Sequence, residues 1–438
     1  MTTLARGPQA RRIARAAALM LAGLPLWLAA QTVTITQPAG LHGLPPEHLL
    51  REALLQAPEA QAASASQRAD HAMATQLRLG PNDWVLRAGL AQRSERGGAS
   101  FSEREIAVER TLRWGSKAAQ DDDLATQVHL VASLRLQSAW QDAAAALLSQ
   151  WFDALRDQQT AWHQQHQVQL ATAQVAALQR RVAAGDAAPL LLRQAEGELA
   201  RTSAAQASAE QRASTSRLAL LRRYPQLAAA WPAAGSAPDT AQADVRQPGS
   251  ADQAKTAEQL LDRHPALGAA QAELVLARLQ LRRLEADRQA DPTLGLRFAQ
   301  ERGGTERVLG FTVSMPFGGP LRESRVQGGQ AALAGAEARL RGLQQQLATD
   351  AARLSAAPEQ AAAVQQRLQA AARAAALSAQ MTQRAQVAGE ATLAELLQQQ
   401  RQAGEAALAG AMADIDLLQA QAGLQLALHR LLPAPVLP

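Results

Sequence analysis

Apolar and polar residues alternate one by one in four short stretches of a chain whose other segments show helical spacing. In the clearest stretch, 308–317, every second residue from Leu309 to Phe317 is apolar. Such a two-residue period is typical of a β-strand with one apolar face. Similar stretches at about 84–92, 105–114 and 293–301 predict three more strands, so the strands are expected in two pairs.

The expected strands share an apolar face, on which Arg110 is the exception, and an opposite face rich in Arg, Glu, Thr and Ser. About ten residues of such alternation are typical of a strand in a transmembrane barrel, with lipid outside and water inside. An antiparallel sheet on a soluble core would alternate in the same way, but little else in the chain is apolar enough to cover it. The residues expected to face lipid are Trp84, Leu86, Val108, Trp114, Leu296, Phe298, Leu309, Phe311, Val313 and Phe317.

The chain contains the same order of elements twice. The segment "HLLREALLQAPEAQAA" (48–63) is similar to "EQLLDRHPALGAAQ" (258–271), and each precedes a pair of expected strands. Long helical runs follow at 116–182 and 321–387, each 67 residues, or about 100 Å if helical throughout. Each run ends in a glycine turn and a further helix. The sequence therefore predicts two structural repeats, 31–230 and 258–431, with a linker at 231–257 and a tail at 432–438.

Two details bear on the long helices. Trp140, Trp151 and Trp162 are spaced by 11 residues, about 3.67 per turn, so they share one helix face. We interpret them as a buried seam against a neighbouring helix, although a ligand-binding tryptophan cluster would show the same spacing. Pro358 lies inside the second run and should kink it, because proline removes a hydrogen bond.

Four strands cannot close a barrel, and an open sheet edge in lipid leaves backbone groups unpaired. Closure therefore requires several copies of the chain. Two copies would supply eight strands and three would supply twelve, and the strand pattern does not choose between them.

The first 30 residues predict a secretory signal peptide, because four arginines precede an apolar run that ends at Ala30. The formal net charge of +5 falls to +1 without those four arginines, since no acidic residue leaves with them. The basic balance is therefore no argument for nucleic-acid binding. The absence of cysteine excludes disulfides and thiolate metal sites. Because Gln31 stands where a lipidated cysteine would be, we expect an unlipidated mature protein.

No sequence motif of a nucleotide-binding, hydrolase or metalloprotease site is present. His163 and His166 could share a helix face and bind a metal, but a third ligand is not apparent, so two solvated histidines are favoured. The acidic run at 120–125 is explained by the dipole of the helix that begins there. We expect neither an enzyme nor a cofactor.

The duplicated order resembles that of the TolC family of outer-membrane efflux proteins, including its heavy-metal and drug exporter branch. The resemblance covers about 45–431 and is carried by the paired "L…P…A" helices, the two strand pairs, the exit "MPFGGPLRESR" and the two glycine turns. It implies a mainly α chain with a small transmembrane β part. Three copies would form a twelve-stranded barrel in the outer membrane of a Gram-negative bacterium, continued by a periplasmic α-helical barrel.

The resemblance also implies sites and partners. The turns with Gly185, Asp186, Gly389 and Glu390 would be tips that dock on a periplasmic adaptor attached to an inner-membrane pump. Glu395 occupies a position at which such channels commonly carry an acidic ring around a closed aperture. A solvated Glu395 paired with Arg401 or Arg384 is an equal alternative.

The main rival is a periplasmic coiled-coil adaptor or another soluble helical interaction protein, because long helical hairpins and some strands are common to both. The duplicated strand pairs favour the channel, since an adaptor does not require them. One feature departs from the duplication: the first strand exit reads Leu112-Arg113-Trp114 where the second reads Met315-Pro316-Phe317. The exported substrate, whether metal ion, drug or peptide, is not indicated by any cluster of residues.

Overall fold

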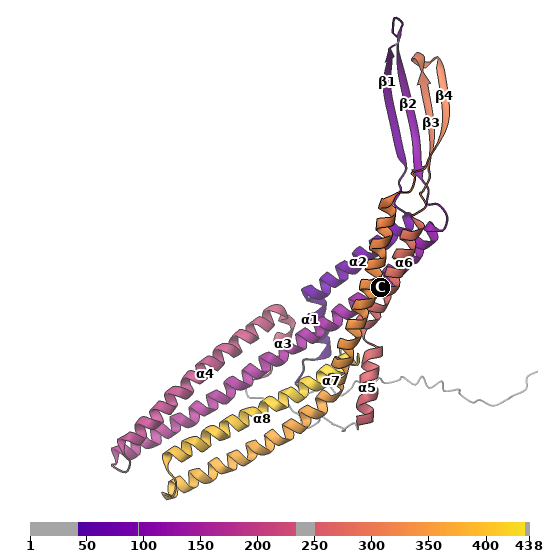
Figure 1. Ribbon diagram of the computed structural model, residues 1–438. Coiled ribbons are helices and arrows are strands. Elements are labelled where there is room, and N and C mark those ends of the chain that lie inside the picture. Colours follow the sequence, from indigo (N-terminus) through magenta and orange to yellow (C-terminus); the bar gives the residue numbers. More distant parts are fainter. Residues whose placement is uncertain (1–42, 95, 234–249, 434–438) are drawn as a thin grey trace, which may run out of the picture. The chain divides into compact units, whose positions relative to one another are not determined.

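The computed structural model describes residues 43–94, 96–233 and 250–433 (Figure 1). The chain divides into two units, Met1–Gly40 and Leu41–Pro438, and every described residue belongs to the second. The expected signal peptide, the mature end at Gln31, most of the linker and the last five residues lie outside the described part.

The order of elements in the first half is repeated in the second (Figure 1). Proline occupies the first turn of the second helix of each half, at Pro58 and Pro265, where its missing N–H has no helical partner to lose. The first half contains α1 (Glu47–Gln56), α2 (Pro58–Leu79), β1 (Val85–Ser94), β2 (Ser100–Thr111), α3 (Lys117–Ala183), α4 (Pro189–Arg223) and the 3-10 helix η1 (Pro225–Ala230). The second contains α5 (Ser250–Asp262), α6 (Pro265–Ala286), β3 (Thr293–Glu301), the 3-10 helix η2 (Arg302–Gly304), β4 (Glu306–Ser314), α7 (Pro320–Ala388) and α8 (Leu393–Ala427).

The two strand pairs join into a single antiparallel sheet with the order β1-β2-β3-β4. The central pairing, between β2 and β3, connects the two halves and places Ile106 opposite Phe298. Each outer pair is a hairpin, with Leu86 opposite Val108 and Leu296 opposite Phe311. Strands β1 and β4 are therefore the two edges of the sheet.

The strand ends differ from those expected. Trp84 precedes the first residue of β1, and Trp114 and Phe317 follow the last residues of β2 and β4, so these three belong to the strand exits. Pro316 has no N–H to donate to a neighbouring strand, and the Trp114 N–H donates instead to Asp291 Oδ1 at 2.9 Å. At the hairpin ends, β2 and β4 begin earlier than expected, at Ser100 and Glu306.

The long helices pair as hairpins, α3 with α4 and α7 with α8. Helix α7 stays one α-helix across Pro358, and Figure 1 shows that its direction changes along its length, as expected for a helix with an internal proline. Among the described helices, none combines the length and the apolar content needed to cross a membrane.

The largest apolar core lies where α1, α3, η1 and the ends of α4 and α8 meet. Trp140 and Trp151 are buried there, and their indole N–H groups donate to the backbone oxygens of Leu432 and Gly43 at 3.3 and 3.1 Å. The expected seam is confirmed for these two residues. It is wrong for Trp162, which is 38% exposed and packs its ring against His163 and His166. The 11-residue spacing places the three tryptophans on one helix face, but the large apolar core extends along α3 only as far as Leu155.

A buried ionic cluster joins the two halves next to the sheet. Asp121 of α3 accepts from Arg113 at 3.0 Å and from Arg283 of α6 at 2.6 Å. Lys117, which is 2% exposed, donates to the Gln289 backbone oxygen and to Asp291 Oδ1, both at 2.7 Å. Asp121 is the first acidic residue of the run at 120–125. These ion pairs, rather than the helix dipole, explain why this position carries a carboxylate.

We predict that Asp121→Ala destabilises the protein by about 3–5 kcal/mol, because it leaves the part-buried guanidinium of Arg113 without a carboxylate and leaves Arg283 with Asp287 alone. The neighbouring Asp122→Ala is the matched control. Asp122 makes one exposed ion pair with Arg78 at 2.9 Å, so its loss should cost less than about 1 kcal/mol. Thermal unfolding followed by circular dichroism measures both. Equal melting temperatures for the two variants would contradict the role of the cluster.

Candidate functional site: the sheet faces and the hairpin turns

The strand register gathers the apolar side chains of all four strands on one face of the sheet. The rows across this face are Leu86, Val108, Leu296 and Phe311, and next to them Ala88, Ile106, Phe298 and Leu309. No described residue covers them, and Leu309 and Phe311 are 79% and 65% exposed. All ten residues expected to face lipid are exposed, including the three at the strand exits. The result is a continuous apolar surface four strands wide.

The opposite face is polar and its charges are paired. Arg87 lies 3.1 Å from Glu109, Arg93 lies 2.8 Å from Glu103, and Arg297 lies 2.8 Å from Glu105. Ala107 and Ala299 lie opposite Arg297 and Glu105 on this face, and both alanines are buried. This face therefore combines polarity with local charge balance.

Arg110, the expected exception on the apolar face, lies at the end of the sheet nearest the helices. Its guanidinium stands 5.1 Å from the centre of the Trp84 ring. A cation over an aromatic face is favourable, so this pair accommodates the charge beside an apolar surface.

The two long hairpins turn in the same way. Gly185 and Gly389 both have a left-handed backbone, with φ of +80° and +82°. In each turn the glycine N–H donates to the oxygen three residues back, and the next N–H donates five residues back, from Asp186 to Arg181 and from Glu390 to Ala385, both at 2.8 Å. These paired bonds form a Schellman motif, in which glycine is strongly favoured.

Glu395 closes the first turn of α8 as part of a capping box. Its Oε2 accepts from the Thr392 backbone N–H at 2.7 Å, and its own N–H donates to Thr392 Oγ1 at 3.2 Å. The backbone and hydroxyl hydrogen bonds from Thr392 hold the pKa of Glu395 below its ordinary value. The carboxylate therefore stays charged while it caps the helix.

The alternative pairing of Glu395 with Arg401 or Arg384 is not what the structure shows. Arg401 lies 3.8 Å from Glu198 of α4 instead. Near the turns, Leu393 of α8 is buried against Val175 and Leu178 of α3 and Ala195 of α4. The two hairpins therefore contact each other close to their turns through an apolar cluster.

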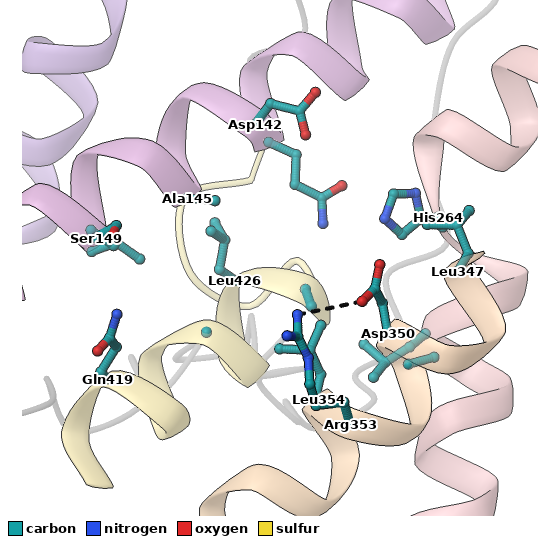
Figure 2. Close-up of a pocket in the computed structure, with 16 residues that line it drawn as sticks. Asp142, Ala145, Ser149, His264, Leu347, Asp350, Arg353, Leu354, Gln419 and Leu426 are labelled. Atoms are coloured by element: carbon teal, nitrogen blue, oxygen red, sulfur yellow. Dashed lines mark ion pairs between the residues drawn. The ribbon is translucent and has the colours of Figure 1, made fainter. Parts of the chain in front are cut away.

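A cavity of about 350 Å³ lies between α3, α7, α8 and the start of α6 (Figure 2). Asp142, His264 and Asp350 come to it from three different elements, and Arg353 lies 3.4 Å from Asp350. These residues are far apart in the sequence and belong to no motif, so no local pattern predicts this cavity.

His264 caps the N-terminus of α6. Its Nδ1 accepts a hydrogen bond from the Ala266 N–H at 3.3 Å, which requires an unprotonated Nδ1. Burial lowers the pKa of His264 below 6.5, and the nearby His429 adds to this, while Asp142 and Asp350 act in the opposite direction. The neutral imidazole is therefore the form that fits the fold.

His163 of α3 packs edge-on to the Trp162 ring and His166 stacks on it, with centroid distances of 4.8 and 6.2 Å. Across the described residues, no group of three or more His, Asp or Glu side chains is arranged to hold a metal ion. This arrangement is explained by aromatic packing alone.

We predict that stability falls as the pH is lowered through about 6.5, the ordinary pKa of histidine. Because the folded pKa of His264 is lowered, its contribution is complete above that pH and is lost on the way down to the folded value. His264→Asn keeps a capping side chain but cannot titrate, so it should flatten this dependence. Melting temperatures of both proteins between about pH 5 and pH 8 test this. An identical slope for the variant would contradict it.

No family model matches the sequence, and no curated protein matches it. Solved structures do match. The CmeC outer membrane channel of Campylobacter jejuni aligns with a TM-score of 0.72 and 11% identity over 87% of this chain and 85% of that chain. The MtrE outer membrane channel of Neisseria gonorrhoeae, in its open state, aligns with a TM-score of 0.69 and 17% identity over 87% and 88% of the two chains.

The outer membrane protein VceC of Vibrio cholerae aligns with a TM-score of 0.66 and 18% identity, over 88% of this chain and 95% of that chain. These alignments cover most of this chain and most of each neighbour's length. They confirm the expected architecture of a mainly helical chain with a small antiparallel sheet. The chain has the fold of these outer-membrane channels.

Proposed function

We propose that the chain is the outer-membrane channel subunit of a tripartite efflux or secretion system in a Gram-negative bacterium, through which exported substrates pass passively. The observation that carries the proposal is the sheet, whose apolar face is exposed over four strands while the opposite face is polar and ion-paired. Lipid outside and water inside a barrel demand this arrangement. The likeness to solved channels supports it.

The strand lengths suit a bilayer. The four strands have 9 to 12 residues, and a strand tilted at about 45° needs about 9–11 residues to cross the hydrocarbon core. Edge strands β1 and β4 carry unpaired backbone groups that lipid cannot satisfy. Pairing β4 of one copy with β1 of the next removes both edges, and three copies would give the twelve-stranded barrel that the family resemblance implies.

The helical part suits a passage that continues away from the membrane. Helix α3 has 67 residues, a length of about 100 Å, and leads from the sheet to the turn at Gly185. We propose that the two turns, with Gly185, Asp186, Gly389 and Glu390, dock on a periplasmic adaptor attached to an inner-membrane pump. Exposed apolar residues beside the turns, Leu190 at 66% and Val387 at 82%, offer contacts for such a partner.

The rival reading, a soluble adaptor, is less consistent with the exposed face. A water-soluble protein rarely exposes an apolar surface of more than a few hundred Å², and this surface spans all four strands. The solved neighbours are channels, and we propose no catalytic role for this chain.

We predict that Phe311→Arg destabilises membrane-inserted protein by about 2–4 kcal/mol, because it places a charge near the middle of the lipid-facing side of β4. Thr312→Arg is the matched control, since the adjacent residue points to the polar face beside Glu109 and Gly295. Outer-membrane fractions are extracted with detergent, and the yield of intact oligomer is compared.

The unmodified chain and Thr312→Arg should give oligomers that require detergent, while Phe311→Arg should give few. Unmodified protein recovered as a soluble periplasmic monomer would overturn the proposed function. Equal oligomer yields for the two variants would overturn the assignment of the faces.

We predict that Glu395→Gln lowers cation selectivity and divalent-cation block in single-channel recordings. Symmetry would bring one Glu395 from each copy around the axis, where carboxylates attract cations. Glutamine can keep the capping box, so only the charge is removed. Glu395→Ala removes the charge and the cap together, and the same electrical change in both variants assigns the effect to charge. Unaltered selectivity and block in both would show that Glu395 does not line the aperture.

A further inference from the structure

Two arginines lie on the apolar face of the sheet at its hairpin end. The register places Leu90, Arg104 and Gln300 in one row across β1, β2 and β3, and Arg307 of β4 pairs with Gln300. Both arginines are exposed. Because β2 and β4 begin before residues 105 and 308, the strands include two cations that the expected bounds had excluded.

These two arginines differ from every other arginine in the four strands. Those on the polar face, at 87, 93 and 297, each pair with a glutamate within 3.1 Å. Arg110 stacks on Trp84. Neither Arg104 nor Arg307 forms an ion pair with any described residue, and the apolar face of the four strands carries no carboxylate. Their positive charge is therefore not compensated by any residue that the structure describes.

The side chains around Arg104 and Arg307 indicate what kind of ligand could neutralise their charge. On one side lies the apolar row that contains Leu309, which is 79% exposed. Leu90, in the row of Arg104 itself, is 85% exposed. On the other side, toward the hairpin turns, Gln92 and Ser102 pair with each other across the strands. A ligand here would meet cations and apolar side chains together, so it must be an amphipathic anion. Guanidinium groups bind phosphate through paired hydrogen bonds.

We propose that Arg104 and Arg307 bind the phosphorylated headgroup of a lipid in the leaflet at the hairpin end of the barrel. The inference rests on the proposed function, since it requires the apolar face to lie in a membrane. Two strand spacings separate the arginines by about 10 Å, so one headgroup with two phosphates, or two neighbouring headgroups, can engage both. The acyl chains then lie along the apolar rows, and the headgroup fixes the depth of the sheet in the membrane.

The test uses the full chain, purified in detergent and reconstituted into phosphatidylcholine vesicles with or without diphosphoryl lipid A. Flotation reports insertion, and native mass spectrometry of the re-extracted protein counts retained lipid. The double variant Arg104→Gln/Arg307→Gln should bind diphosphoryl lipid A about 25-fold more weakly, since each arginine near an anionic lipid surface contributes about fivefold. Arg87→Gln/Arg297→Gln removes the same charge from the opposite face and should leave binding unchanged.

Each of the following results would overturn the inference. Protein that inserts but retains phosphatidylcholine and diphosphoryl lipid A equally overturns this inference and leaves the proposed function intact. Equal loss in both double variants shows a nonspecific charge effect and also overturns it. If millimolar inorganic phosphate displaces bound diphosphoryl lipid A as effectively as free lipid does, the arginines form a site for a phosphate ion, and the lipid proposal is overturned. Protein that fails to float with vesicles overturns the proposed function, and the inference with it.

Discussion

The structure depends on one constraint: a four-stranded sheet with an exposed apolar face and two unpaired edges is incomplete as a single chain. The apolar rows around Phe311 and Phe298 have no covering element among the described residues, and β1 and β4 each offer a row of free backbone groups. Lipid can cover the apolar face, but it cannot form hydrogen bonds with the backbone groups at the edges. Further copies of the chain satisfy the edges but leave the outer face to lipid. Only assembly within a membrane answers both demands.

The rest of the chain holds this sheet on long helices. The buried cluster of Asp121, Arg283 and Lys117 fastens the exit of β2 to the end of α6, so the two halves meet through charges as well as strands. A buried ion pair is costly to break and fixes geometry more than it adds stability. At the far ends of the helices, matching Schellman turns and the cluster around Leu393 set the hairpins side by side.

Periodicity predicted the strands, the long helices and their duplication, because burial on one face leaves a repeat that a single sequence displays. It also selected the ten apolar residues that the structure leaves exposed. Strand ends were less predictable, since Trp114 depends on a hydrogen bond to Asp291, 177 residues away. The exposure of Trp162 and the cavity at His264 depend on distant neighbours that no local pattern specifies. The capping role of Glu395, in contrast, follows from the local Thr-x-x-Glu pattern that begins at Thr392. The sequence alone does not show that Arg104 and Arg307 lack an ion-pair partner, because the strand register decides that both lie on the face without carboxylates.

The central claim, that β4 of one copy pairs with β1 of the next until three copies close, can be measured directly because the chain has no cysteine. Val313→Cys is combined in turn with Leu86→Cys, Ala88→Cys and Leu90→Cys, all on one face of the sheet. After oxidation in the membrane, denaturing gels should show covalent dimers and trimers, with the trimer as the largest species, for the pair in register. Crosslinks absent from every pair, or a ladder that continues beyond three chains, would contradict the account.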